Sequence, residues 1–200
     1  MDILIEEDKV RIISEIKELV AQHGIAPLSN ISLNGLTSNQ FDVVAAGSLV
    51  YRQNGTVVLV RRAETPLEWV IPGGIVDPGE KIAETVIREV REETGLNSEI
   101  EGILRIGLAV NYGPEAFRKV NKERFGKESI NLLFVNFRNR ETDGVMDCGT
   151  DPSNNILEVK EFSEVPFELI THVYKVLFVQ QGLYSANLSN YPAVEFYPES

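Results

Sequence analysis

The sequence predicts an α/β protein in which a mixed β-sheet carries helices on both of its faces. β-rich segments occur on both sides of a helical segment at 78–94, and amphipathic helices are expected near the two ends, at 5–23 and 167–180. Strands and helices in this order typically form one sheet covered by helices. The 200 residues suffice for one sizeable core and hardly for two independent domains.

The first forty residues differ in composition from those that follow. Residues 5–23 have apolar side chains at helical spacing, and Gly24 provides a C-terminal stop. Residues 25–40 are rich in Ser, Asn and Gly, which is typical of a linker. Whether the helix covers the core or contacts a second subunit stays open. The apolar stripe of the helix consists of Val10, Ile13, Ile16 and Val20, widened by Ile12 and Leu19. The predicted division is an N-terminal helix and linker (1–40), a domain (41–182) and a C-terminal tail (183–200).

Five segments are expected to be strands, because they are rich in β-branched and aromatic residues. The first two flank Asn54-Gly55, and this dipeptide is a strong signal for a β-hairpin. The charged segment 111–128 and the polar segment 138–154 are expected to be loops. The predicted strands are 42–51, 56–62, 100–110, 130–137 and 156–162.

The net charge and the cysteine content limit which binding partners and which cellular compartment are expected. A net charge of −11 repels polyphosphate backbones, so long nucleic acid is not expected as a partner. A small anionic substrate remains compatible with this charge if a metal ion reverses it locally. The single cysteine, Cys148, excludes an intramolecular disulfide and fits a reducing compartment. Without a signal peptide or an apolar run long enough for a membrane span, a cytoplasmic protein without membrane contact is expected.

The segment 78–94 has helix signals at both ends. Asp77 is a favourable N-cap, Pro78 suits the first helical position, and Glu80 at the third position would complete a capping box. Gly95 is suited to a left-handed C-terminal stop. The helix is therefore expected to begin near Pro78 and to end just before Gly95.

This helix places three carboxylates, Glu89, Glu92 and Glu93, on one side, bordering its apolar face. Like charges four residues apart are unfavourable, and so are anions near a helix C-terminus. Arg88 and Arg91 lie on another side and relieve this conflict only in part. A divalent cation such as Mg²⁺ would remove it, since Mg²⁺ prefers hard oxygen ligands. The alternative is a solvated acidic face that binds nothing.

The spacing of these residues is specific. Residues 74–96 resemble the Nudix box, GX5EX7REUXEEXGU with U a bulky aliphatic residue, and every fixed position matches. The matching residues are Gly74, Glu80, Arg88, Glu89, Val90, Glu92, Glu93, Gly95 and Leu96.

The resemblance implies a Nudix fold, which is a mixed sheet in an α/β/α sandwich, here with an N-terminal helical extension. It also implies a hydrolase that cleaves a diphosphate linkage in a small nucleoside diphosphate derivative with metal-activated water. Mg²⁺, or Mn²⁺, would be held by Glu89, Glu92 and Glu93, which supply ligands or activate water, and by the carbonyl of Gly73. Arg88 would orient a ligand carboxylate. Glu80 would pair with Arg88, serve in the outer shell of the metal, or simply cap the helix.

Residues outside the box would determine the substrate specificity. Arg61 and Arg62 end a strand just before the box and are candidates for binding the far phosphate; as surface charges they have an equally good explanation. Tyr112 stands sixteen positions after the box. A tyrosine at this position resembles the marker of the dinucleoside-polyphosphate hydrolases. Pro114, two residues further on, resembles the proline that marks the ADP-ribose hydrolases. The segment 111–128 offers aromatic residues for base stacking or for anchoring to the core, acidic residues for a further ligand or base, and basic residues for phosphates.

Two other functions share these residues. One is a nucleotide-sensing Nudix domain without catalysis, and the other is an RNA-cap hydrolase, for which the basic residues in 118–127 are the only support. The resemblance also makes a homodimer an option, with the N-terminal helix as a candidate contact.

Overall fold

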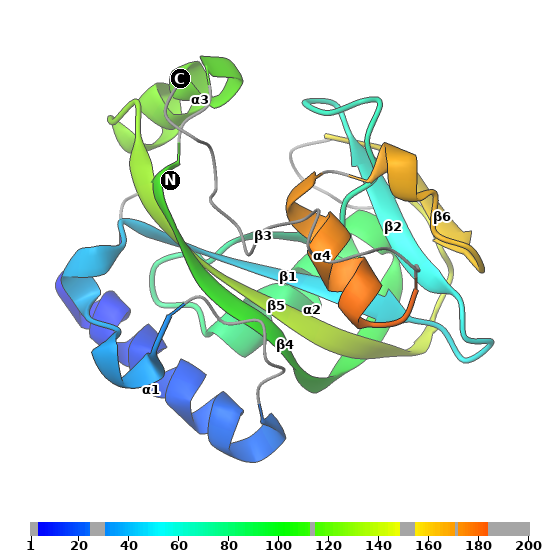
Figure 1. The fold of residues 1–200 in the computed structure, drawn as a ribbon, viewed down its shortest axis with the longest axis horizontal. Helices are drawn as coiled ribbons and strands as arrows, with labels where there is room; N and C mark the ends of the chain where they lie inside the picture. The colour runs from blue at the N-terminus through cyan, green and yellow to red at the C-terminus, as the bar shows by residue number, and fades with distance from the viewer. Residues whose placement is uncertain (1–3, 25–30, 113–114, 149–154, 171, 184–200) are drawn as a thin grey trace.

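The computed structural model describes residues 4–24, 31–112, 115–148, 155–170 and 172–183 (Figure 1). The strands are β1 (Val43–Tyr51), β2 (Val57–Arg62), β3 (Gly73–Ile75), β4 (Leu96–Tyr112), β5 (Ile130–Gly144) and β6 (Ile156–Phe162). The helices are α1 (Glu6–His23), α2 (Ile82–Thr94), α3 (Glu115–Phe125) and α4 (His172–Gln180), with short 3-10 turns at Leu33–Gly35, Ser38–Gln40 and Phe167–Leu169.

The six strands form one mixed sheet in the order β4-β5-β1-β2-β6, with β3 also paired to β1. β1 and β5 are parallel, whereas the other pairs are antiparallel. The predicted hairpin between β1 and β2 is confirmed: Gly55 has φ of 84°, and the N–H of Arg52 donates to the carbonyl of Thr56 at 2.9 Å. The mixed sheet of the predicted fold class is therefore present.

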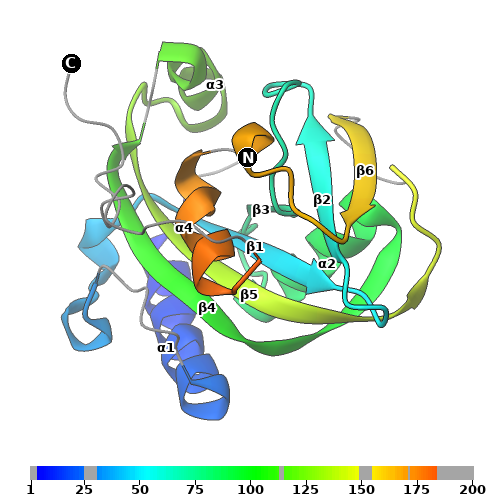
Figure 2. The same ribbon diagram turned by 45° about the vertical axis from the view of Figure 1, so that its right-hand side comes forward.

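Helices cover both faces of this sheet, as Figures 1 and 2 show. Successive side chains of a strand point to opposite faces, so the packing of β1 separates the two layers. Val44 and Ala46 lie in an apolar cluster with residues of α1 and α2. Leu49 lies in a different cluster, with Leu177 and Phe178 of α4. The α/β/α layering is therefore confirmed.

Helix α1 packs against the core. Ile12, Ile13 and Ile16 are buried in the same cluster as the apolar residues of α2 and the sheet. The predicted stripe is wrong at Val10, which is 56% exposed, because the helix turns the side of Ile12 and Ile16 inward. In the predicted linker, Leu36 is buried in this cluster, while residues 25–30 lie outside the described part of the chain. The division at residue 40 stays a prediction.

Four predicted segments differ from the structure in kind or in bounds. The segment 111–128, predicted as a loop, contains α3, and β4 begins at Leu96 rather than at residue 100. β5 continues to Gly144, seven residues beyond its predicted end. The helix predicted at 167–180 is divided into a 3-10 turn and α4.

Within the described residues, none of these helices is both long enough and apolar enough to cross a membrane.

Candidate active site

Helix α2, which carries the three carboxylates, begins later than the sequence indicates. Its first residue is Ile82 and its N-cap is Lys81, whose side chain makes no capping hydrogen bond. The predicted start at Asp77 and Pro78 is therefore wrong. Gly79 has φ of 81°, and this left-handed conformation turns the chain out of the helical path before α2 begins.

The predicted C-terminal end of α2 is confirmed. Gly95 has φ of 73°, and its N–H donates to the carbonyl of Arg91 at 2.9 Å. Leu96 then starts β4 and is fully buried. This stop fixes the last turn of α2, and with it Glu92 and Glu93, against the sheet.

Two consecutive glycines of β3 lie between β1 and α2. Gly73 and Gly74 pair with Gly47 and Ala46 of β1. A Cβ on Gly73 would lie 2.4 Å from the carbonyl oxygen of Ala46, and a Cβ on Gly74 would lie 2.2 Å from Oε1 of Glu89. Both separations are far shorter than van der Waals contact. Only glycine therefore allows this approach of β3 to β1 on one side and to Glu89 on the other.

Glu93 is held in a closed triangle with Arg62 and Gly73. Its side chain is buried, and Oε2 accepts a hydrogen bond from the N–H of Gly73 at 2.9 Å. Oε1 pairs with Arg62 at 2.7 Å, and Arg62 also donates to the carbonyl oxygen of Gly73. The carbonyl predicted as a metal ligand thus shares a hydrogen-bonding partner with the Glu93 carboxylate.

Arg88 connects the other carboxylates. It forms two hydrogen bonds with Glu80, of 2.7 and 2.9 Å, and its Nη1 donates to Glu89 at 2.8 Å and to Glu92 at 3.1 Å. These are the ion pairs that the resemblance implies for Arg88. The expectation from helix geometry alone, that Arg88 lies on another side, is wrong for its side chain, which folds along the helix toward the carboxylates. Glu80 pairs with Arg88 and also accepts a hydrogen bond from the N–H of Asp77 at 3.3 Å.

The site holds more negative than positive charge. Four carboxylates, those of Glu80 and the three on α2, share the two arginines Arg62 and Arg88. Burial raises the pKa of Glu89 above its ordinary value, although the charge of Arg88 partly offsets this. Burial is the largest single influence on Arg62 and lowers its pKa, but the nearby Glu93, Glu89, Glu64 and Tyr174 together outweigh burial and raise the pKa of Arg62. The four carboxylates of the site therefore carry more negative charge than the two guanidinium groups offset.

The Glu80–Arg88 pair should make the stability of the protein depend on pH. Burial disfavours the charged form of Glu80, but hydrogen bonds from Arg88 and Thr85 outweigh it, so the pKa of Glu80 is lowered in the folded protein. A lowered pKa stabilises the folded state above the unfolded-state pKa, about 4.3, and this contribution disappears as the pH falls through the folded-state value.

The measurement is the free energy of unfolding, from urea titrations in EDTA between about pH 3 and 7, for the unchanged protein and for Glu80→Gln. We expect the unchanged protein to be more stable at neutral pH and the difference to shrink below about pH 4. Glu84→Gln is the control, because Glu84 is exposed on α2, the helix that carries Arg88. A difference that is independent of pH would contradict the role of this ion pair.

The oxygen atoms gathered here suit a hard divalent cation. Glu89, Glu92 and Glu93 offer carboxylates and Gly73 a carbonyl oxygen, which is the ligand chemistry of Mg²⁺ and Mn²⁺. No three His, Cys, Asp or Glu side chains of the described residues converge as a ready metal cage; arginines bridge the carboxylates instead. Two arginines for four carboxylates leave negative charge that a cation would offset. The donor set therefore fits the metal that the sequence predicts.

The structure separates the residues predicted to bind substrate. Arg62 lies in the site, bound to Glu93. Arg61 points elsewhere: it pairs with Glu158 of β6, and its guanidinium lies 5.3 Å from the centre of the Trp69 ring. Tyr112 is the last residue of β4, paired with Ile130 of β5, and its side chain lies outside the described part.

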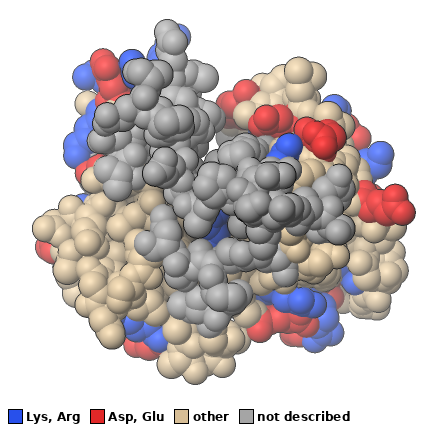
Figure 3. All heavy atoms as spheres, viewed as in Figure 1, with Lys and Arg blue, Asp and Glu red and all other residues tan. Residues whose placement is uncertain are grey.

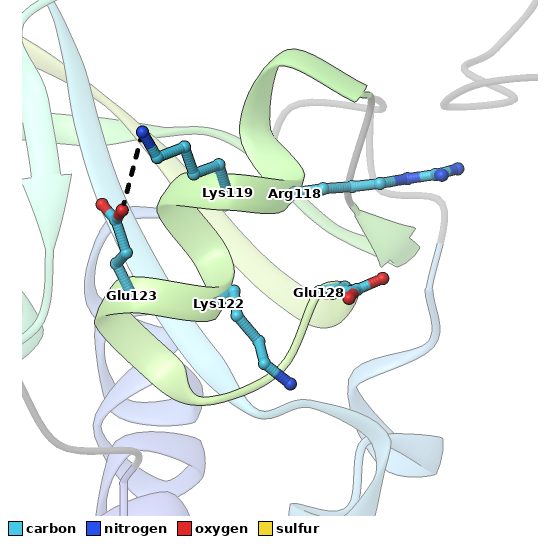
Figure 4. A pocket seen from close by; sticks show the side chains of 5 residues that line it. All are labelled: Arg118, Lys119, Lys122, Glu123 and Glu128. Carbon is cyan, nitrogen blue, oxygen red and sulfur yellow. Dashed lines mark ion pairs between the residues drawn. The ribbon is translucent and has the colours of Figure 1, made fainter.

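Helix α3 carries the basic residues that suggested phosphate binding. They line a shallow depression of about 330 Å³ formed by Arg118, Lys119, Lys122, Glu123 and Glu128. In Figure 4 these side chains spread around the helix rather than converging, and Lys119 pairs with Glu123 at 3.9 Å. Figures 1 and 2 place α3 at one end of the molecule, away from α2. Phe125 is buried, in agreement with the alternative that it anchors this segment to the core; Phe117 and Glu115 have side chains outside the described part.

Tyr174 and Arg105 lie near the site but were missed or left ambiguous by sequence reasoning. Burial raises the pKa of Tyr174, whose phenol interacts electrostatically with Arg62 and Glu93. Burial lowers the pKa of Arg105 to about 10, and its guanidinium lies 4.7 Å from the centre of the Phe134 ring. A charged residue within the apolar run of β4 was the available signal for Arg105. For Tyr174 the signal was its helical spacing from apolar residues of α4.

Sequence reasoning also missed the contribution of α1. Asp8, Arg11 and Glu15 of this helix form hydrogen bonds with the segment 79–82, immediately before and at the start of α2. No local pattern signals these contacts, because they join segments about 70 residues apart in the chain.

Comparison with known proteins identifies the family to which this chain belongs. The family model for the NUDIX domain matches residues 42–177, which is more than half of the chain, so the protein belongs to the NUDIX domain family. Among its relatives, nucleoside diphosphate-linked moiety X motif 6 of Xenopus laevis is 42% identical over 44% of this chain and 39% of that protein.

Two further relatives carry different names. A putative 8-oxo-dGTP diphosphatase of Bacillus subtilis is 44% identical over 30% of this chain and 38% of its own length. An ADP-ribose pyrophosphatase of Methanocaldococcus jannaschii is 34% identical over 32% of this chain and 38% of its own length. The chain therefore spans less than two fifths of each of these relatives.

Proposed function

We propose that this protein is a Mg²⁺-dependent hydrolase that cleaves a diphosphate linkage in a small nucleoside diphosphate derivative. ADP-ribose and dinucleoside polyphosphates are the substrates to test first. One observation carries the proposal: Glu93 and Glu89 lie against Gly73 and Gly74, Arg88 joins Glu89 to Glu92, and the four carboxylates of the site share only two arginines. A bound divalent cation would supply the missing positive charge and would also attract the oxygens of an anionic diphosphate.

The box residues would divide the work as follows. Glu89, Glu92 and Glu93, with the carbonyl of Gly73, would hold the metal, which when bound supplies neutralisation of phosphate charge and acidification of water. Glu89 is also suited to accept a proton, because burial raises its pKa and makes its carboxylate a stronger base than an ordinary glutamate. Arg88 would keep Glu89 and Glu92 in position.

Arg62 would take part at a different stage. In this structure Arg62 pairs with Glu93 and donates to the carbonyl oxygen of Gly73. Both of these groups are proposed ligands of the metal. Once the metal replaces its charge, Arg62 would be available to a phosphate oxygen of the substrate, which guanidinium binds well. The position of Arg62 next to the carboxylates supports the predicted role in phosphate binding. Arg61 forms an ion pair with Glu158 instead, and this pair does not support a phosphate-binding role for Arg61.

A small substrate fits the surface better than a long nucleic acid. On the face seen in Figure 3, the described Lys and Arg side chains lie interspersed with Asp and Glu rather than in one basic track. With a net charge of −11, this supports a substrate whose phosphates are bound locally.

The test is a substrate panel with Mg²⁺ or Mn²⁺: ADP-ribose, NADH, dinucleoside polyphosphates, nucleoside triphosphates including 8-oxo-dGTP, sugar nucleotides and a capped RNA. Products are identified by chromatography, and hydrolysis in ¹⁸O-labelled water locates the phosphorus that water attacks. We expect metal-dependent cleavage of a small diphosphate compound. Tight binding of a nucleotide without turnover would instead identify a sensor, and preferential cleavage of capped RNA would identify a cap hydrolase.

A further inference from the structure

Helix α1 contacts the box at the N-terminus of α2, where the N-cap residue Lys81 makes no capping hydrogen bond with its side chain. We propose that three α1 side chains, Asp8, Arg11 and Glu15 (the α1 clamp), are positioning residues for the metal-binding carboxylates of α2. This inference rests on the proposed function, because it concerns the geometry of the same site. It assigns α1 a role in activity in addition to its apolar packing.

The clamp supplies hydrogen bonds that α2 and its preceding turn lack. Glu15 accepts a hydrogen bond from the N–H of Ile82, the first residue of α2, at 3.1 Å. Asp8 accepts one from the N–H of Gly79 at 3.1 Å. N–H groups at a helix start need such acceptors, and Lys81 at the N-cap has no side chain suited to the task. Acidic side chains also complement the positive end of the α2 dipole.

Arg11 joins the clamp to the backbone of Glu80. Its Nη1 donates to the carbonyl oxygen of Glu80 at 2.9 Å and to Glu15 at 2.9 Å, while its Nη2 donates to Asp8 at 2.9 Å. All three clamp residues are at most about one third exposed, so water competes weakly with these bonds. The position of the Glu80 backbone is therefore fixed from α1.

The connection continues from Glu80 to the metal-binding carboxylates. The Glu80 side chain holds Arg88 in two hydrogen bonds, and Arg88 in turn donates to Glu89 and Glu92. A displaced Glu80 backbone would move this carboxylate and release Arg88. The rotamers of Glu89 and Glu92 would then lose their support. Groups that orient metal ligands in this way commonly affect metal affinity or activity by about 10- to 100-fold.

The main variant is Arg11→Ala, with Lys17→Ala as the matched control, because Lys17 is an exposed cation on the same helix. Mn²⁺ binding is measured by electron paramagnetic resonance without substrate, and kcat and KM are measured with the substrate found in the panel. For Arg11→Ala we expect about 10-fold weaker Mn²⁺ binding and about 10-fold lower kcat. KM should stay within about 2-fold, since the clamp is argued to act on the carboxylates and not on substrate binding.

A double-mutant cycle tests the route. If Arg11 acts through Glu80, then Arg11→Ala should have less than about a 2-fold further effect in a Glu80→Gln background. Fully additive effects would overturn this route, and a merely structural role of Arg11 would give unchanged Mn²⁺ affinity at temperatures where the variant is folded. Should Arg11→Ala fail to fold, Asp8→Asn provides the same measurements with a smaller change.

The two proposals fail in different ways. Absence of metal-dependent turnover in the unchanged protein would overturn the proposed function. Normal turnover together with equal Mn²⁺ affinities for Arg11→Ala and Lys17→Ala would overturn the role of the α1 clamp alone.

Discussion

Replacement of Glu93 by glutamine is expected to lower kcat by a factor on the order of 10²–10⁴, the range typical of a lost catalytic carboxylate. Glutamine has nearly the same shape but no charge, and it offers one oxygen where Glu93 uses two, toward Gly73 and Arg62. The variant would therefore lose one of the carboxylates that we propose as metal ligands. In metal-free protein it would also leave the Arg62 guanidinium without a matching carboxylate, which should cost about 1–3 kcal/mol of unfolding free energy.

The measurements are kcat at saturating Mg²⁺ and the unfolding free energy in EDTA. Glu84→Gln is the matched control, because it makes the same chemical change on an exposed side of α2. Full Mg²⁺-dependent activity of Glu93→Gln would contradict the assignment of this carboxylate.

Replacement of Gly74 by alanine is expected to abolish most activity while leaving the fold nearly intact. The new Cβ would meet the carboxylate of Glu89 at 2.2–2.8 Å, and this carboxylate is the far end of a flexible side chain. Glu89 can therefore swing away at small cost in stability, but it then leaves the position from which we propose that it binds the metal. We expect a loss of kcat of about 10- to 100-fold, with a change in unfolding free energy below about 1 kcal/mol.

Two other glycines make the comparison informative. In Gly73→Ala the Cβ would meet backbone atoms of Ala46 and Gly47, which cannot move without shifting β1, so we expect a loss of about 1–3 kcal/mol of stability. A Cβ on Gly102 of β4 would have open space around it, with no neighbouring atom within 4 Å, so Gly102→Ala serves as the control. Retention of normal Mg²⁺ affinity in Gly74→Ala would show that Glu89 is not a ligand.

The box could be predicted from sequence because its residues are close together in the chain. The last turn of α2, the stop at Gly95 and the grouping of the three glutamates all follow from helical spacing. The start of α2 could not be predicted in the same way. Its capping acceptor, Glu15, comes from α1 and is 67 residues away from Ile82. The local signals at Asp77 and Pro78 were real preferences, but this tertiary contact and the turn at Gly79 prevailed.

The second half of β5 shows a related limit. Residues 138–144 contain charged and polar side chains and were predicted as loop for that reason. They form a strand because the first half of β4 presents opposite charges across the pair: Arg138 and Arg140 both donate to Glu101. Such pairs stabilise strands on an exposed face, but they are invisible until the register is known. Substrate-contacting residues outside the box depend on similar long-range packing.

The parallel pairing of β1 with β5 has a consequence for how the protein is made. One edge of β1 pairs with β3, which contains Gly73 and Gly74, and the other edge of β1 pairs with β5. The N–H of Asn131 donates to Asp42 across 89 residues of chain, so this edge of β1 stays unpaired until much of the chain has been synthesised. At about 5–20 residues per second the delay is roughly 4–18 s. During that interval the nascent chain exposes an apolar strand edge that invites pairing with other chains, and we expect its yield on expression to depend on chaperones.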